Sequence, residues 1–206
     1  MASSVIHMCV AKEINKKLKM DQNMILLGSI APDISKHLGK TKKESHFLTD
    51  GYHVDIEAFI NKYKDNLIEP FIMGYFIHLY TDLLWDKYFV SEIIEKNSIK
   101  LLDGTKVEKT KELYKKLIYN DYTNLNIKLI DEYGLDLSLF YEEARIPNIN
   151  MDEIPIDKLS LIIEQTGIII QNTKEQKAYI FELDNIKTFI NTTSNLIYLK
   201  ISEMFS

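Results

Sequence analysis

The sequence predicts an all-α protein, a single multi-helix domain over residues 1–206, on three observations. Only seven glycines and four prolines occur in the chain, so few positions break a helix. Apolar residues recur at helical spacing in most segments. No stretch rich in Gly, Ser or Pro forms a linker, and 206 residues suffice for one substantial core. We expect the functional site within residues 1–90 and a helical scaffold over residues 91–206.

Capping residues and periodic apolar positions predict the first two helices. Ser3 or Ser4 could cap a helix whose apolar residues recur at helical spacing, namely Ile6, Val10, Ile14 and Leu18. A second helix is expected over residues 22–29, because Pro32 cannot continue a helix and restricts the residue before it. Asp33 is therefore expected to project from a turn.

Two further helices are expected before residue 91. One covers residues 54–63, and the other begins at Glu69 and Pro70, since proline is well tolerated in a first turn, and runs to about Val90. Residues 34–50 are polar and irregular and hold four lysines, Lys36, Lys40, Lys42 and Lys43. Such a loop is typical of solvated surface, and it could also attract an anionic substrate.

The remaining chain is expected to be helical apart from one small feature. The Asp103-Gly104 turn lies between short apolar segments, compatible with a hairpin or a plain loop. Apolar periodicity predicts helices over residues 108–133, ended by Gly134, over 137–144 and over 156–171. Residues 179–183 are expected to be extended, and Asp184 could cap a last helix that ends at Met204.

Charge and cysteine content disfavour several classes of protein. The net charge of -5 argues against a nucleic-acid coat, which needs a basic face. The single cysteine, Cys9, excludes an intramolecular disulfide and a cysteine-based zinc knuckle, and makes a cytoplasmic location the simplest expectation. No apolar run reaches the roughly 18 to 20 residues of a spanning helix, and none at the start resembles a signal peptide. We expect peripheral membrane contact at most.

One stretch, GYFIHLYTDLLWDKY over residues 74–88, carries two ionisable residues inside an apolar and aromatic run. In a helix, His78 and Asp82 project from one face a single turn apart, close enough to share a metal ion. A His–Asp hydrogen bond satisfied within the core is the structural alternative. The chain has five histidines, none beyond position 78, namely His7, His37, His46, His53 and His78. Their confinement to the first part of the chain favours a site there.

A set of nitrogen and oxygen ligands can be assembled from this region without any thiolate. Its members are His7, Asp33, His46, His78 and Asp82. Imidazole and carboxylate are the ligands of zinc in open catalytic sites, and iron or manganese would also accept them. Five ligands exceed the need of one tetrahedral ion. The surplus favours two ions about 3.5 to 4 Å apart that share a carboxylate, as in phosphoester hydrolysis.

Four motifs occur together in this region, IHM, GSIAPDI, SHF and GYFIHLYTD. Their order and context resemble the bacterial zinc-dependent phospholipase C family, which is related to the S1/P1 nucleases. The resemblance covers roughly Val5 to Val90, and less distinctly the stretches DYTNLN from Asp121 and FELDNIKTFI from Phe181. Each motif alone is a weak signal, and the set is fairly specific.

The resemblance implies the helical fold of that family and a zinc-dependent hydrolase of phosphoester bonds. By this resemblance Asp33, His46, His78 and Asp82 match the ligands of one zinc ion. His7, with Asp82 as a bridge, matches part of a second. A metal-activated hydroxide would attack phosphorus, with Asp33 orienting or deprotonating it. The expected substrate is a phosphoester small molecule or a phospholipid head group. His37 and His53 match no motif and are expected at the surface or behind the ligands.

Two departures from the family pattern bear on these expectations. Secreted members use a mature N-terminus that begins with tryptophan as a ligand, whereas this chain begins MASS. The family's third zinc is held by a downstream histidine and an H-x-x-x-E motif, which this chain lacks. Asp86 or Asp121 could substitute, but a site for one or two ions is the simpler expectation.

Other classes of function stay open at this point. A catalytically inactive metal-binding or regulatory protein of the same fold is the main alternative, and a purely structural helical protein with satisfied core histidines is another. An HD-type phosphohydrolase is disfavoured because no His-Asp pair is adjacent in the sequence. Ferritin-like chemistry is disfavoured because Glu-x-x-His pairs are absent.

Overall fold

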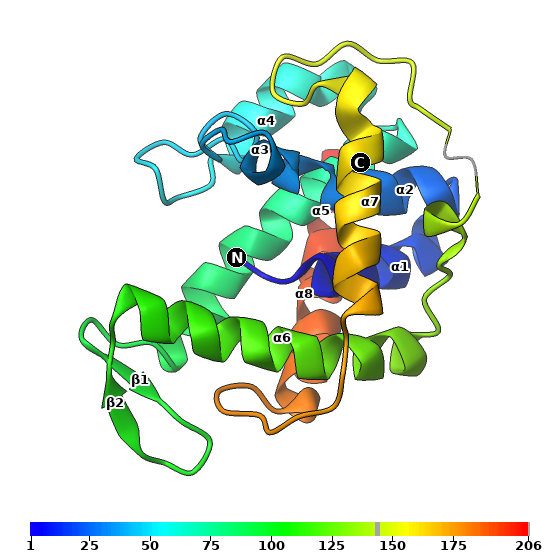
Figure 1. Cartoon of the computed structure of the whole chain (residues 1–206). Helices are drawn as coiled ribbons and strands as arrows, with labels where there is room; N and C mark the ends of the chain where they lie inside the picture. The colour runs from blue at the N-terminus through cyan, green and yellow to red at the C-terminus, as the bar shows by residue number, and fades with distance from the viewer. Residues whose placement is uncertain (143–144, 206) are drawn as a thin grey trace.

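Helices dominate the computed structural model, which describes residues 1–142 and 145–205 (Figure 1). This confirms the all-α class, while the specific fold type stays a prediction. The helices are α1 (Ser4–Leu18), α2 (Gln22–Ile30), α3 (Ile34–His37), α4 (Ile56–Tyr63), α5 (Pro70–Leu84), α6 (Lys111–Tyr133), α7 (Leu159–Gln171) and α8 (Leu183–Met204). None of the helices in the described chain combines the length and the apolar character needed to cross a membrane.

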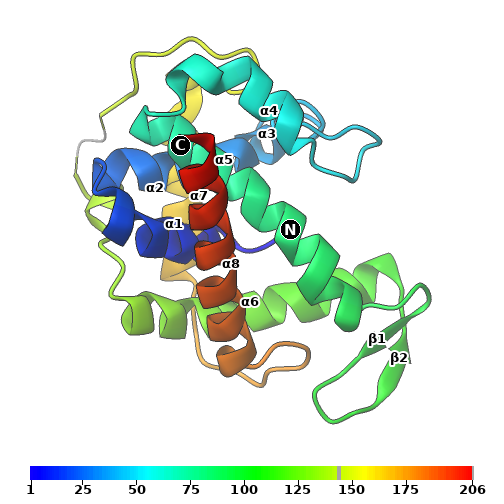
Figure 2. The ribbon, with the colours of Figure 1, turned by 180° about the vertical axis from the view of Figure 1, so that it is seen from behind.

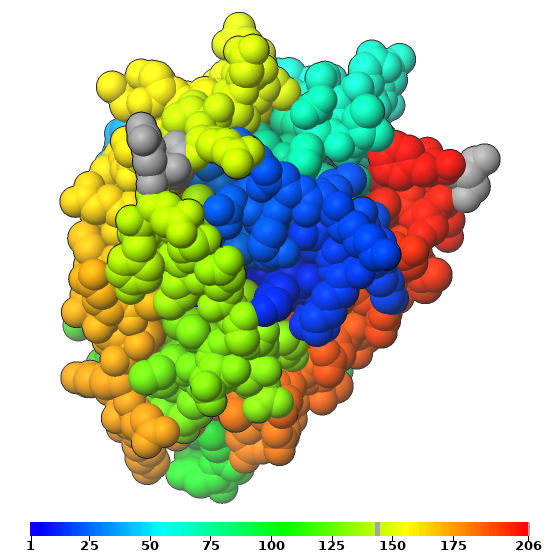
Figure 3. Space-filling view, turned by 90° about the vertical axis from the view of Figure 1, so that its right-hand side faces the viewer, coloured from blue at the N-terminus to red at the C-terminus, as the bar shows by residue number. Residues whose placement is uncertain are grey.

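Helix α5 lies at the centre of the molecule, and the other helices are arranged around it. Helix α2 packs against it, and α1 contacts α2, α5, α6 and α8. Helix α7 crosses in front of α1 and α2 in Figure 1, and α8 lies on the opposite side, in front in Figure 2. A third view shows α1 and α2, in blue, flanked by the yellow-green chain that follows α6 and by α8 (Figure 3). The N-terminal half of α5 is therefore enclosed, and residues 71–79 are all buried.

Of the two alternatives for the Asp103-Gly104 turn, a hairpin or a plain loop, the structure has the hairpin, which extends away from the helices (Figures 1 and 2). Strand β1 (Ser98–Lys100) pairs antiparallel with β2 (Lys106–Glu108). Gly104 adopts a positive φ of 83° in the turn between them, where a side chain would be strained. None of the candidate site residues lies on this small sheet.

Side-chain caps define where several helices begin. The Ser3 hydroxyl accepts a hydrogen bond from the Ile6 amide, as expected for the start of α1. Asp21, Asp55 and Thr110 cap α2, α4 and α6 in the same way. Gly134 ends α6 in the left-handed conformation, as predicted from its position.

Several predicted boundaries were wrong. The central helix leaves α geometry at Trp85 and continues as a π-helical turn over Trp85–Phe89. Asp184 lies in the first turn of α8 rather than at its cap, which is Glu182. A short helix, α3, interrupts the segment expected to be irregular. The expected helix over residues 137–144 is only a 3-10 turn at Ser138–Phe140, and residues 143 and 144 lie outside the described chain.

The segment before α8, which is expected to be extended, is not part of a sheet and is held by hydrogen bonds to a buried carboxylate. Asp121 on α6 accepts hydrogen bonds from the backbone amides of Tyr179 at 2.9 Å, Ile180 at 2.6 Å and Phe181 at 2.9 Å. A carboxylate satisfied by three amides is stable in a buried position. Asp121 therefore ties the start of α8 to α6.

Two glycines allow α2 and α5 to approach each other backbone to backbone. A methyl group at Gly74 would overlap the carbonyl oxygen of Ile25, and one at Gly28 would overlap the carbonyl oxygen of Phe71. Backbone atoms in two packed helices cannot move aside as a flexible side chain can. The close contact therefore requires glycine at both positions.

We expect Gly74→Ala to destabilise the protein by about 3 kcal/mol or more, because an added methyl group must push the two helices apart. Chemical denaturation monitored by circular dichroism measures the effect. Gly167→Ala in α7 is the matched control, since the nearest atom to its new methyl group would be a ring carbon of Phe140 at 3.9 Å. That variant should be neutral or stabilised by up to about 1 kcal/mol through helix propensity. Equal effects of the two substitutions would contradict the close helix contact.

Candidate metal centre

Five side chains predicted as ligands from the sequence meet at one buried place. Four elements of the chain supply them: α1, the turn before α3, the loop between α3 and α4, and α5. All five are nearly inaccessible to solvent, with exposed fractions of 0% to 3%: His7, Asp33, His46, His78 and Asp82. Ionisable groups are rarely buried to this extent unless they are paired or coordinate a metal.

The ligand atoms form two groups that share one histidine. His7, His78 and Asp82 make the first group, and Asp33, His46 and His78 make the second. In each group every pair of candidate ligand atoms lies within 4.8 Å. We call these the α1–α5 group and the loop–α5 group. Each could hold a metal ion.

In the α1–α5 group, the His7 ring stacks on the His78 ring with centroids 3.8 Å apart. His7 Nε2 lies 3.3 Å from Asp82 Oδ1, and His78 Nε2 lies 3.5 Å from Asp82 Oδ2. Ligand atoms around one zinc ion, each about 2.0 to 2.2 Å from the metal, are separated by comparable distances.

In the loop–α5 group, His46 Nε2 lies 3.2 Å from His78 Nε2 and 3.7 Å from Asp33 Oδ1. It also lies 3.7 Å from Asp82 Oδ2. Asp82 therefore lies between the two groups, as a bridging carboxylate would.

The helix contact at Gly28 and Gly74 sets the orientation of His78. It brings the Ser29 carbonyl oxygen to 2.7 Å from His78 Nδ1. A carbonyl oxygen can only accept, so Nδ1 carries the proton and donates it. The lone pair of His78 is left on Nε2, which faces the other ligands. A backbone carbonyl in this role is common behind metal-binding histidines.

A chain of hydroxyl groups orients His46 in a similar way. Ser35 donates to the Pro32 carbonyl at 3.4 Å, and Ser45 donates to the Ser35 hydroxyl at 3.1 Å. The Ser45 oxygen, 3.0 Å from His46 Nδ1, is then free only to accept. His46 therefore also presents an unprotonated Nε2 toward the cluster.

Several of the buried ligand atoms make no hydrogen bond. Both ring nitrogens of His7 and the Oδ2 oxygen of Asp82 have no hydrogen-bond partner within the described chain. An unsatisfied buried polar atom costs about 1 to 3 kcal/mol, more if charged. The structural alternative requires a satisfied His–Asp hydrogen bond, and the Asp82 oxygen nearest His78 makes none. Unpartnered nitrogen and oxygen atoms that converge fit a divalent cation.

The pKa values of His46 and His78 favour the protonation state that metal binding requires. Burial, followed by the Lys42 ammonium, lowers the pKa of His46 to about 4. Burial and the neighbouring His7 hold the pKa of His78 well below its ordinary value. These imidazoles are therefore neutral near pH 7, as metal ligands must be.

The two carboxylates stay ionised for a different reason. Burial raises the pKa of Asp33, but the ammonium groups of Lys42 and Lys36 outweigh burial and hold this pKa well below its ordinary value. Burial also raises the pKa of Asp82, and the larger opposing effect of His7 and the N-terminal amine lowers it overall.

Part of the lysine-rich loop belongs to the site. Lys42 pairs with Asp33 Oδ1 at 2.5 Å, and its Nζ lies 3.4 Å from His46 Nε2. Lys36 lies 3.5 Å from Asp33 Oδ2. Lys40 and Lys43 are exposed, as expected for a surface loop. The sequence indicates Lys42 only as one of four loop lysines, although its position four residues before His46 is a signal that it could lie near that ring.

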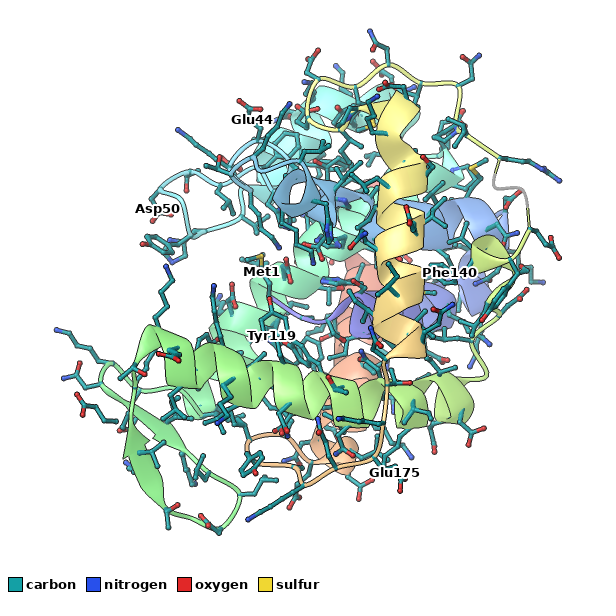
Figure 4. The ribbon with its side chains drawn as sticks, viewed as in Figure 1. Met1, Glu44, Asp50, Tyr119, Phe140 and Glu175 are labelled. Atoms are coloured by element: carbon teal, nitrogen blue, oxygen red, sulfur yellow. The ribbon has the colours of Figure 1, made fainter. Side chains whose placement is uncertain are left out.

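The N-terminal segment runs along the cluster. The Ala2 amide donates to Asp82 Oδ1 at 2.9 Å, and the Tyr122 hydroxyl donates to the Met1 carbonyl at 2.8 Å. Met1 lies between α6 and the loop that carries Glu44 and Asp50 (Figure 4). The segment therefore covers the α1–α5 group on this side.

The other candidate residues lie apart from the two ligand groups. Asp86 pairs with the N-terminal amine at 3.1 Å, Asp121 binds the amides before α8, and neither belongs to one of the two ligand groups. His53 is exposed and lies 2.6 Å from Asp50, as expected of a surface residue. His37 is half-buried at the end of α3.

Comparisons of the chain with protein-family models, with curated proteins and with solved structures gave no match. The resemblance to zinc-dependent phospholipases C therefore stays a prediction carried by the four motifs.

The stability of the metal-free protein should decrease as the pH falls from about 7 to 4. His46 has a lowered pKa in the folded state, so the unfolded state binds more protons in this range and acid favours unfolding. A shift from 6.5 to about 4 corresponds to about 3 kcal/mol for His46 alone. Urea denaturation at several pH values in the presence of a chelator measures it. His46→Gln should reduce the slope and His53→Gln should not; an unchanged slope in the first variant would contradict the assignment.

Proposed function

We propose that this chain is a metal-dependent hydrolase that acts on phosphoester bonds, with zinc as the ion that its ligands suit best. Iron or manganese would be acceptable to the same nitrogen and oxygen atoms. The observation that carries the proposal is the pair of buried ligand groups that share His78, with Asp82 between them. The resemblance of the four motifs to zinc-dependent phospholipases C supports the same reaction.

The site offers places for one or two ions, with His7, His78 and Asp82 as the ligands of one group and Asp33, His46 and His78 as those of the other. A bound divalent ion supplies a Lewis acid and lowers the pKa of a coordinated water. Asp33 stays ionised beside Lys42, so its carboxylate can accept a hydrogen bond from a water and orient it. A carboxylate with so low a pKa is a poor proton acceptor, which favours orientation over deprotonation as its role.

The substrate class follows from the charge around the site. Lys42 and Lys36 lie beside Asp33 at the less buried side of the cluster, with exposed side-chain fractions of 20% and 37%. Ammonium groups beside a metal site attract phosphate oxygens. A phosphoester small molecule or a phospholipid head group fits this arrangement.

A catalytically inactive metal-binding or regulatory protein of the same fold is the second candidate. No histidine follows His78, so the ligands that hold a third zinc in the resembling family have no counterpart here. Asp86 and Asp121, the carboxylates considered as replacements, have other partners. This candidate keeps the metal site and omits the turnover.

We expect protein prepared without chelators to contain zinc and to hydrolyse a chromogenic phosphodiester such as bis(4-nitrophenyl) phosphate. His78→Ala should lower the rate by at least about 100-fold, because it removes a ligand common to both groups. Substitution of a residue that only hydrogen-bonds to a metal ligand typically lowers activity by about 10- to 100-fold. Metal content by mass spectrometry and release of nitrophenolate are the measurements. His53→Ala is the matched control, since His53 is an exposed histidine.

Circular dichroism of each variant separates loss of the site from loss of the fold. Protein that binds no metal when zinc is supplied would refute the metal-dependent hydrolase. Zinc binding without turnover of phosphodiesters or phosphomonoesters would favour the second candidate.

A further inference from the structure

The two ligand groups cannot be filled in the same way, because they share a single lone pair. His78 donates its Nδ1 proton to the Ser29 carbonyl, so only Nε2 can bind a metal. This atom faces both groups, 3.5 Å from Asp82 Oδ2 and 3.2 Å from His46 Nε2. Once His78 binds an ion in the α1–α5 group, the loop–α5 group keeps Asp33 and His46, and its third ligand would have to be Asp82, whose Oδ2 oxygen lies 3.7 Å from His46 Nε2.

The two groups also differ in their local charge. In the loop–α5 group, the Lys42 ammonium contacts Asp33 Oδ1 and lies 3.4 Å from His46 Nε2. It therefore lies beside two of the three ligand atoms that would face an ion. In the α1–α5 group, the His7 nitrogens and Asp82 Oδ2 have no hydrogen-bond partner within the described chain.

Charge balance supports the same distinction. The buried Asp33 carboxylate needs a nearby cation, because an isolated buried charge is strongly unfavourable. Lys42 supplies it, and Lys36 adds a second, more distant ammonium at 3.5 Å. A divalent ion at the same place would have to displace Lys42 or lie against its positive charge.

We propose that Lys42 is the resident cation of the loop–α5 group, so that this chain binds one metal ion, in the α1–α5 group, and uses the lysine where a second ion would lie. The inference rests on the proposed metal-dependent function and specifies its centre. The ion is held by His7, His78 and Asp82. Lys42 pairs with Asp33 and presents a positive charge to a phosphate oxygen, as a second ion would.

Zinc stoichiometry tests the proposal without reference to activity. Native mass spectrometry and isothermal titration with zinc should give one ion per chain for the wild-type protein. Lys42→Met, which removes the charge but keeps an unbranched apolar side chain, should bind two. Lys40→Met is the matched control: it removes the same charge from an exposed position in the same loop and should still bind one.

A second pair of variants locates the single ion. His7→Ala should abolish zinc binding, because His7 belongs only to the α1–α5 group. Asp33→Asn, an isosteric change in the other group, should retain one ion. Lys42→Gln provides a second neutral variant if Lys42→Met does not fold, and circular dichroism checks each protein.

The possible outcomes separate this inference from the proposed function. Two ions in the wild-type protein, or one ion in both folded neutral Lys42 variants, would overturn the role of Lys42 and leave the metal-dependent hydrolase standing. Loss of the ion in Asp33→Asn with retention in His7→Ala would also overturn it. No zinc in any variant would refute the metal site itself and both proposals with it.

Discussion

The backbone contact between α2 and α5 is the constraint on which the rest of the structure depends. Glycine at positions 28 and 74 allows the two helices to meet without intervening side chains. The contact carries the Ser29 carbonyl to His78 and so determines which nitrogen of that ring is free. It also places the turn that follows α2, and with it Asp33, beside the same histidine. A single packing event therefore aligns residues from two distant segments.

The cluster is costly for a helical core, because it concentrates five ionisable side chains where apolar ones would pack well. Part of that cost is offset by hydrogen bonds from behind, through Ser29, Ser45 and the Ala2 amide. Another part is offset by the lysine that neutralises Asp33. The cost of burying the unpartnered atoms of His7 and Asp82 is not offset within the described chain. A cation bound to these atoms would therefore stabilise the fold most.

The C-terminal part of the chain contributes by holding the N-terminal segment in place. Tyr122 and Asn126 on α6 bind Met1 and Ser3, so the residues that lead into α1 are fixed against α6. Asp121 fixes the start of α8 from the same helix. Scaffold and site are thus connected through hydrogen bonds of α6, and not through the apolar core alone.

The sequence by itself determined the helical class, a cap at Ser3 or Ser4, a turn at Asp103-Gly104 and the relation of His78 to Asp82. These features depend on local periodicity and on the chemistry of single residues, which any one sequence displays. Only the tertiary structure decided that His7 stacks on His78, that Lys42 lies against Asp33, and that Asp121 binds the amides before α8. Such contacts join residues that are far apart in the chain or that lie in a loop, where no periodic pattern indicates which side chains meet. They depend on how closely the helices pack, and the overlap that excludes a methyl group at Gly28 or Gly74 exists only once the helices have met.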